Sequence, residues 1–306
     1  MSDSSELSFT LGDRLNWHHV VCETEYIVTF LDSNLPLSVD AKNAIGELKT
    51  RPRFIEFDEG EAVLILRMPV LTEEIEQLES IRFYFNGDTL YSFSRSPIYQ
   101  VSQLKRLISK LKVSNSKMEL LVWQIVDFIV SNVAQSLRVR EEELIELEDE
   151  WLESHHMDVD RLHTLQQRLS AHGRFLPAQL DALNRLTVDF YDNGKKTGKL
   201  RYRWQDTKNE QKRSIEVLKE MKERIRILLE SLQHRTNVEL SHNMYVFSVV
   251  ATFFLPLTFL TSLLGMNVSG IPQYSTFDFW VLCAVLGVFA FGQWMLFRRS
   301  KFWRKD

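Results

Sequence analysis

The sequence is poor in cysteine and lacks an N-terminal export signal. Its 306 residues include two cysteines, Cys22 and Cys283, so neither a disulfide network nor a zinc site built from cysteines is expected. The opening segment MSDSSELSFTLGDRLNW has acids where a signal peptide needs basic residues, and it lacks an apolar segment. We therefore expect the N-terminus to stay in the cytoplasm. No grouping of nucleophile, base and metal ligands indicates an enzyme, and we expect neither a bound cofactor nor a nucleic-acid partner.

Charge is also missing from one part of the chain. Residues 1–243 carry 32 basic and 39 acidic side chains, whereas Asp278 is the only Asp, Glu, Lys or Arg from Met244 to Phe297. The final nine residues, RRSKFWRKD, add five basic side chains. This partition predicts a soluble body attached to a C-terminal membrane anchor.

The uncharged region contains two long apolar runs, 244–264 and 277–297, each of 21 residues. A helix rises about 1.5 Å per residue, so either run can cross a hydrocarbon core of about 30 Å. Five basic residues follow the second run, and the connection between the runs has none. The positive-inside rule then places both termini in the cytoplasm, in the inner membrane of a bacterium.

Two helices cannot enclose a polar pathway, so a conducting role requires several chains around an axis. The first run has a stripe of mostly small or polar residues at alternating steps of four and three, which keeps one face turned inward. Its members are Met244, Ser248, Ala251, Leu255, Thr258 and Ser262. A small-residue face also serves ordinary helix packing in membranes, and the stripe alone does not separate the two interpretations.

The stripe leads to the segment LLGMNVSGIPQ, residues 263–273. Gly265 can end the helix, and the amide oxygen of Asn267 is a neutral acceptor that can bind the waters of a hydrated divalent cation. The run TFFLPLTFLTSLLGMN, 252–267, resembles the first membrane helix and Gly-Met-Asn signature of the CorA metal-ion transporter superfamily. The following VSGIP is similar to the zinc-transporter branch, ZntB.

This resemblance implies a homopentamer in membrane lipid, with a central pore for divalent cations and a cytoplasmic funnel. It assigns the pore entrance to Gly265, Met266 and Asn267, and pore-facing positions to Met244, Leu255 and Thr258. The loop 268–276 lacks the acid that is usual in magnesium-type relatives, which favours zinc, whereas Met266 is more typical of the magnesium branch. We favour zinc, because the loop changes the electric field at the mouth.

The cytoplasmic body is predicted to be an α/β domain followed by a long helical stalk. Residues 53–66 and 81–94 each contain two β-rich runs around a turn, and 102–112 is a short amphipathic helix. Helices are expected over 117–154 and 158–190, and from Lys199 without a break into the membrane. The predicted divisions are 1–112 (α/β domain), 113–198 (helical region), 199–243 (stalk), 244–264 (first span), 265–276 (outward-facing loop), 277–297 (second span) and 298–306 (basic tail).

Three further features of the body have two interpretations each. The stalk residues Leu218, Met221, Ile225, Leu228 and Leu232 have heptad spacing, so they could pack in a five-chain bundle or on their own domain. The acidic run 141–153 is usually a paired or solvated surface, although Glu141, Glu142 and Glu143 could also concentrate cations near the funnel. The pair His155-His156 precedes Asp158 in a segment that we interpret as a helix–helix turn rather than a zinc site.

Two histidines near the first span, His234 and His242, are candidates for proton sensing or coupling because histidine titrates near neutral pH. Taken together, the sequence predicts a transporter of divalent cations, with zinc uptake favoured and a magnesium (or cobalt or nickel) channel of the CorA type as the alternative. A membrane-tethered sensor or scaffold is the alternative of another class. The substitution Asn267→Ala separates them, because a tether tolerates it and a pore mouth does not.

Overall fold

The structure is a computed structural model that divides into two compact units, Met1–Leu228 and Leu229–Asp306. It describes residues 5–11, 15–22, 24–34, 37–47, 50–57, 61–71, 76–87, 89–95, 118–154, 157–192, 199–265 and 276–299. The helix expected over 102–112, the pair His155-His156 and most of the loop after Gly265 lie outside these ranges.

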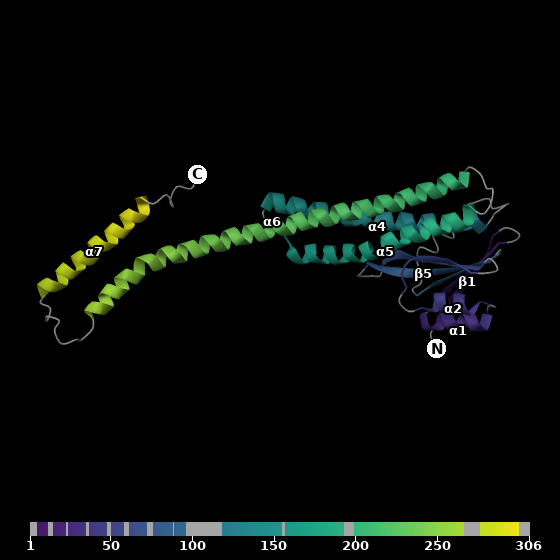
Figure 1. Ribbon diagram of the computed structural model, residues 1–306, viewed down its shortest axis with the longest axis horizontal. Helices are drawn as coiled ribbons and strands as arrows, with labels where there is room; N and C mark the ends of the chain where they lie inside the picture. Colours follow the sequence, from purple (N-terminus) through teal and green to yellow (C-terminus); the bar gives the residue numbers. More distant parts are fainter. Residues whose placement is uncertain are drawn as a thin grey trace. The chain divides into compact units, whose positions relative to one another are not determined.

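The N-terminal unit is built on a mixed six-stranded sheet in the order β1-β2-β6-β5-β4-β3 (Figure 1). Neighbouring strands are antiparallel except β2 and β6, which run parallel. The strands are β1 (Ser5–Leu11), β2 (Leu15–Val21), β3 (Arg53–Glu56), β4 (Glu61–Leu71), β5 (Glu76–Asn86) and β6 (Thr89–Ser94). The α/β character expected of the N-terminal part is confirmed.

Both hairpins expected from the sequence are present. In the first, β3 pairs with β4 and places Phe54 opposite Leu64. In the second, β5 pairs with β6 and places Asn86 opposite Thr89. Gly87, which follows Asn86 in the turn, has a φ of 53°, and a residue without Cβ adopts this left-handed conformation at little cost.

Helices cover both faces of the sheet. α1 (Thr24–Asn34) and α2 (Val39–Gly46) pack on one face, where Ile27 and Ile45 are buried with the odd-numbered Val63 and Ile65 of β4. α4 (Met118–Ser154) and α5 (Val159–Asp192) pack on the other face. The alternation follows from the strand period of two, which turns successive side chains to opposite faces.

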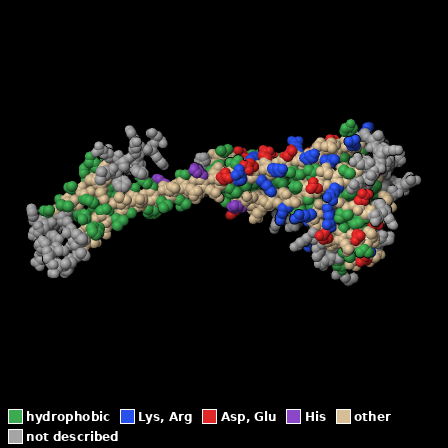
Figure 2. Space-filling model, viewed as in Figure 1, with side chains coloured by type: hydrophobic (Ala, Val, Ile, Leu, Met, Phe, Trp, Pro, Cys, Tyr) green, Lys and Arg blue, Asp and Glu red, His purple; other side chains and the backbone are tan. Residues whose placement is uncertain are grey.

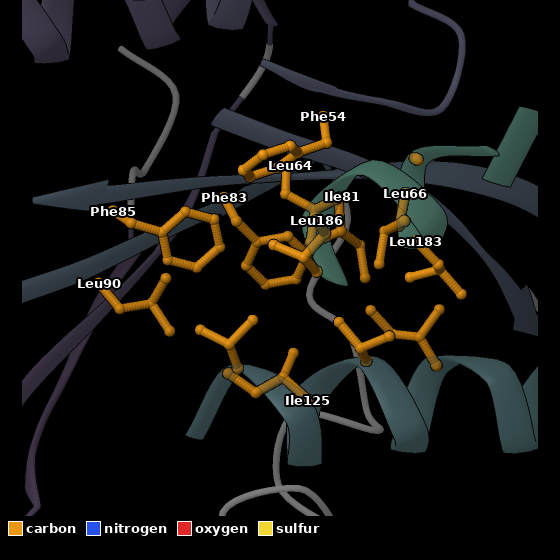
Figure 3. Packing of buried hydrophobic residues seen from close by; sticks show 14 of the residues in the cluster. Phe54, Leu64, Leu66, Ile81, Phe83, Phe85, Leu90, Ile125, Leu183 and Leu186 are labelled. Carbon is orange, nitrogen blue, oxygen red and sulfur yellow. The ribbon is translucent and has the colours of Figure 1, made fainter. Parts of the chain in front are cut away.

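The larger core lies between the sheet and α4 and α5 (Figure 3). Figure 3 shows Leu64 and Phe83 from the sheet facing Ile125 of α4, with Leu183 and Leu186 of α5 closing the cluster. Leu64, Leu183 and Leu186 have no exposed surface, so this contact fixes the helices on the sheet.

The first part of α6 (Lys199–Leu264) packs with α4 and α5 inside the N-terminal unit. The hydroxyl of Thr207 donates to Asp127 Oδ1 at 2.6 Å and accepts from Trp123 Nε1 at 3.1 Å, which joins α6 to α4. Gln211 Nε2 donates to the Leu176 carbonyl at 3.1 Å, which joins α6 to α5.

The heptad residues of α6 belong to this packing. Leu218, Met221, Ile225 and Leu228 are all buried within the single chain. Of the two interpretations that the spacing allowed, packing on the chain's own domain is therefore the correct one for these four residues. A five-chain bundle cannot use side chains that the chain has already covered.

The C-terminal unit consists of the rest of α6 and α7 (Thr276–Arg299). α6 runs without a break from Lys199 to Leu264, as expected, and Figure 1 shows it bending near its C-terminal end. Among the described residues, α4 and α6 are long and apolar enough to cross a membrane, and the described apolar part of α7, Cys283–Met295, is shorter. The apolar stretch of α4 is half buried and forms part of the core, whereas that of α6 is not buried at all.

Candidate functional site

The predicted stripe of α6 is exposed along its whole length. All six of its residues lie on the surface, with 72% of Met244 and 68% of Leu255 accessible. Figure 2 shows many hydrophobic side chains along the C-terminal unit, whereas many charged side chains gather over the α4–α6 bundle. The stripe therefore has free access to a second copy of the chain or to solvent.

The opposite side of the same helix is partly covered. Its half-buried positions are Tyr245, Val249, Phe253, Pro256, Leu257 and Leu260. At about 100° of rotation per residue, the centre of this set lies roughly 155° from the centre of the exposed stripe. The two sets thus occupy nearly opposite sides of α6.

The partly covered side faces α7. On α7, Leu286, Ala290 and Gln293 are half-buried and share one helix face at steps of four and three. The side-chain amide of Gln293 donates to the carbonyl of Thr252 at 3.4 Å, which joins the two helices directly. The second helix consequently leaves the small and polar stripe uncovered.

The C-terminal end of α6 agrees with the expected helix stop. The helix ends at Leu264, and the amide of Gly265 donates to the Thr261 carbonyl at 3.0 Å. A Cβ on Gly265 would lie 3.3 Å from that carbonyl oxygen, so a larger residue would crowd the last turn. Met266 and Asn267 lie outside the described residues, and their role at a pore entrance stays a prediction.

The two histidines proposed for proton coupling are both exposed on α6. By the same rotation per residue, His242 lies roughly 160° from the centre of the stripe, and His234 roughly 80° from it. The helix therefore does not bring the pair together with the stripe: His234 is closer to it in angle about the axis, whereas His242 is closer to it along the axis.

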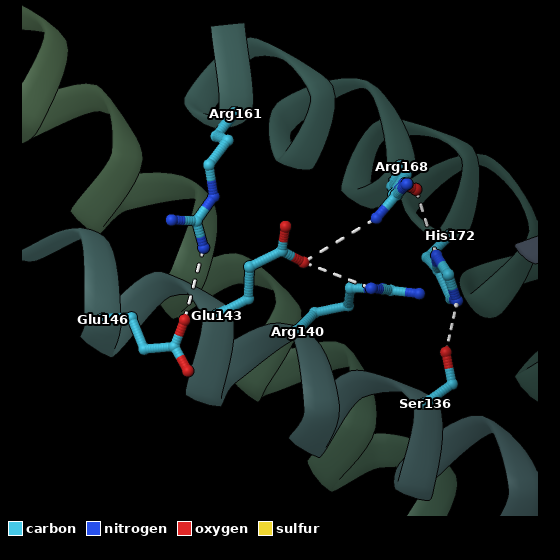
Figure 4. A network of polar contacts seen from close by, with 7 residues as sticks. All are labelled: Ser136, Arg140, Glu143, Glu146, Arg161, Arg168 and His172. Carbon is cyan, nitrogen blue, oxygen red and sulfur yellow. Dashed lines mark hydrogen bonds and ion pairs between the residues drawn. The ribbon is translucent and has the colours of Figure 1, made fainter. Parts of the chain in front are cut away.

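Among the described residues, half of the eight acids in the α4 run 141–153 form ion pairs with arginines, and Figure 4 shows two of them. Glu143 contacts Arg140 at 3.1 Å and Arg168 of α5 at 3.8 Å, and Glu146 contacts Arg161 at 3.3 Å. These contacts favour the interpretation of the run as a paired surface.

A second set of pairs joins α4 to α6. Arg224 makes hydrogen bonds to both carboxylate oxygens of Glu148 and lies 3.9 Å from Glu141. The bonds to Glu148 raise the pKa of Arg224. Glu142, by contrast, is exposed and forms no ion pair with any residue that the structure describes, so it is the member of the Glu141–Glu143 set most available to solvent cations.

The adjacent histidines of β2 point to opposite faces of the sheet. His18 stacks on Tyr91 with ring centroids 4.9 Å apart, whereas His19 lies between the hydroxyls of Ser92 and Ser94. Among the residues that the structure describes, no group of three or more His, Cys, Asp or Glu is placed to hold a metal ion.

Asp158 caps the start of α5, as the interpretation of this segment as a helix–helix turn requires, whereas His155 and His156 lie outside the described residues. Its Oδ1 accepts the backbone amides of Asp160 and Arg161, each at 3.0 Å, as the N-cap of α5 does. This carboxylate is therefore engaged by the helix start.

Comparison with known proteins decides the family. The family described as "CorA-like Mg2+ transporter protein" matches residues 12–299. This chain belongs to the CorA family. Its coarse function follows: it is a membrane transporter of divalent cations, and it is not an enzyme.

Two relatives of this CorA-family chain cover nearly its whole length. "Divalent cation transporter CmaX" of Pseudomonas aeruginosa is 27% identical and spans 94% of this chain and 86% of that protein. "Zinc transport protein ZntB" of Vibrio parahaemolyticus is 26% identical and spans 95% and 90%.

Solved structures agree with the fold of this CorA-family chain. Full-length CmaX gives a TM-score of 0.74 at 25% identity, over 96% of this chain and 91% of that one. The CorA magnesium transporter of Methanocaldococcus jannaschii gives 0.76 at 24% identity, over 97% and 93%. The arrangement of an N-terminal α/β domain followed by a long helix is thus shared.

One residue of this unit was missed by sequence reasoning. Gln293 was treated as part of an apolar span, although its amide bridges α7 to α6. A signal was available, because Gln293 is the only amide side chain in 277–297 and the proline at 256 leaves a carbonyl without its helical donor.

Proposed function

We propose that this chain assembles as a homopentamer in the bacterial inner membrane and conducts divalent cations along the exposed stripe of α6. The observation that carries the proposal is the position of the stripe. It is mostly small or polar, it is uncovered in the single chain, and it lies opposite the side that faces α7. Polar side chains suit an aqueous pathway better than lipid, and a closed ring of copies would supply one.

The proposed orientation has both termini in the cytoplasm and Gly265, Met266 and Asn267 at the outer mouth. The five basic residues after residue 297 support this topology through the positive-inside rule. The five copies of Asn267 in the pentamer would then present a ring of amide oxygens to a hydrated cation. The predicted domain divisions follow from the same topology.

Zinc is the proposed cargo, in uptake that a proton gradient drives. The uncharged loop after Asn267 supports zinc as the cargo, and so does the similarity to proteins named for zinc transport. Magnesium is the second candidate, supported by Met266 and by the description of the matching family. Both ions would pass the same stripe.

The first experiment measures cargo and coupling. The purified full-length chain is reconstituted in liposomes with a zinc-sensitive dye, with and without an inward proton gradient, and the assay is repeated for magnesium. Zinc entry that rises with the gradient and is lost in Asn267→Ala supports the proposal. Magnesium entry that ignores the gradient assigns the second cargo, and absence of flux for both ions supports a tethered sensor or scaffold.

A second experiment tests the stripe itself with a charged thiol reagent. The chain offers a clean background, because Cys22 is buried and Cys283→Ser removes the exposed thiol. In that background Ser248→Cys and Thr258→Cys should lose flux on labelling. Val250→Cys, which is exposed on α6 about 120° from the stripe centre, is the matched control and should keep it. Equal loss at all three positions would contradict a pathway along the stripe.

A further inference from the structure

Pro256 leaves a gap in the hydrogen-bond ladder of α6. Proline has no amide hydrogen, so the carbonyl four residues earlier, at Thr252, has no donor within the helix. In the hydrocarbon region water does not supply the missing bond, and another side chain must do so. The gap lies between the stripe residues Ser248 and Thr258.

Gln293 of α7 supplies that donor. Its Nε2 lies 3.4 Å from the Thr252 carbonyl oxygen, 41 positions away in the sequence. The chemistry fixes the orientation of the amide, because only its NH2 group can face a carbonyl oxygen. Its Oε1 is buried without a hydrogen-bond partner among the residues that the structure describes.

Two threonines beside the gap also bond to the helix backbone. Thr252 Oγ1 donates to the Ser248 carbonyl at 2.7 Å, and Thr261 Oγ1 donates to the carbonyls of Leu257 and Thr258 at 3.0 Å each. Such bonds from a side chain to the backbone of the preceding turn often bend helices. Together with Pro256 they make 248–261 the segment where α6 bends most easily.

We propose that Gln293 is a positioning residue that latches α7 onto the Pro256 gap and fixes the bend of the pathway-lining helix. The hydrogen bond selects one angle between the segments before and after Pro256. It thereby sets how Ser248 and Thr258 line up along the stripe. This inference rests on the proposed function, because it gives the bend a role in conduction.

A double-mutant cycle tests the latch. Gln293→Leu keeps the size of the side chain and removes the donor. Pro256→Ala supplies a backbone amide at position 256, which can donate to the Thr252 carbonyl. We expect Gln293→Leu to change zinc or magnesium flux about threefold to tenfold, the range of one hydrogen bond. In the Pro256→Ala background the same substitution should change flux less than about twofold. An equal change in both backgrounds would overturn the inference.

Gln293→Glu gives a readout that a purely structural role does not move. A protonated carboxyl can donate to the Thr252 carbonyl, and an ionised one cannot. The flux of this variant relative to wild type should therefore depend on pH, and in the Pro256→Ala background that dependence should disappear. A ratio that does not change with pH would argue against the latch.

A distance measurement separates failure of the latch from failure of the proposed function. Spin labels at Ser248→Cys and Ser262→Cys, in Cys283→Ser chains diluted with unlabelled ones, are about 21 Å apart on a straight helix. Gln293→Leu should broaden this distance distribution with Pro256 present and leave it unchanged in Pro256→Ala. An unchanged distribution in both rejects the latch, and a wild type without flux rejects the proposed function while the distances still decide the latch.

Discussion

His19 should make the stability of the N-terminal unit depend on pH. The side chain is 1% exposed, with Nδ1 2.8 Å from Ser92 Oγ and Nε2 3.2 Å from Ser94 Oγ. Trp17 Nε1 donates to Ser92 Oγ at 2.8 Å, so the Ser92 hydroxyl is free to donate to Nδ1. Nε2 then carries the proton and donates to Ser94, which satisfies the neutral ring completely.

Burial lowers the pKa of His19 from 6.5 to about 4. Below pH 6.5 the unfolded chain binds a proton that the folded chain does not, so stability is complete above 6.5 and falls as the pH drops towards 4. One pKa unit corresponds to about 1.4 kcal/mol, so the gap is worth about 3 kcal/mol in full. Between pH 7.5 and 4.5 the expected loss is about 2–3 kcal/mol.

The assay is urea unfolding of the full-length protein in micelles, followed by circular dichroism across that pH range. His19→Gln removes the titrating group. Between pH 7.5 and 4.5 its free energy of unfolding should therefore fall by about 2–3 kcal/mol less than that of the wild type. His18→Gln is the matched control for loss of a histidine, because His18 is the neighbouring residue of β2 and is half-buried on the opposite face of the sheet. Parallel curves for wild type and His19→Gln would refute the reasoning.

Three further substitutions probe the packing, each read by the same unfolding assay. Leu64→Ala opens a cavity in the main core and should cost about 2–5 kcal/mol, so a loss below about 1 kcal/mol would contradict the packing. Glu148→Gln breaks the ion pair between Glu148 and Arg224, in which each side chain is 25% exposed. It should lower the free energy of unfolding by about 1 kcal/mol, and by less at high salt. Gly46→Ala normally stabilises a helix, but here its Cβ would collide with Val28, so we expect a loss of about 1–3 kcal/mol, and any gain would reject that contact.

Local signals in the sequence predicted much of the fold. The hairpin at Asn86-Gly87 needs only a turn that accepts a positive φ and flanking β-rich runs, and both are local. The end of α6 beside Gly265 was predicted for the same reason, since a glycine readily ends a helix.

Contacts that depend on distant residues could not be predicted. Arg82 donates to the Glu47 carbonyl and Arg67 to the Thr50 carbonyl, and no spacing in the sequence indicates either bond. The link between Gln293 and Thr252 is an intermediate case. Pro256 leaves the Thr252 carbonyl without its helical donor, and Gln293 is the only amide side chain in 277–297, but only the fold shows that the two meet.

The two stripes of α6 show why spacing alone did not settle the interpretation of this helix. Residues 218–228 and 244–262 both repeat at steps of four and three, yet the first set is buried in its own chain and the second is exposed. The first is wholly apolar, whereas the second contains Ser248, Thr258 and Ser262.

Large apolar residues stabilise the fold most when they are buried against the chain's own domain, because the stabilisation grows with the apolar area removed from water. Serine and threonine gain little from such burial, and they gain nothing from lipid. Their presence on an exposed face, within a segment that has no charge, therefore points to contact with water or with a second copy of the same helix. The proposed pathway satisfies both conditions, since each copy presents its stripe to the axis while bulky neighbours such as Phe247 and Phe254 remain for lipid and packing.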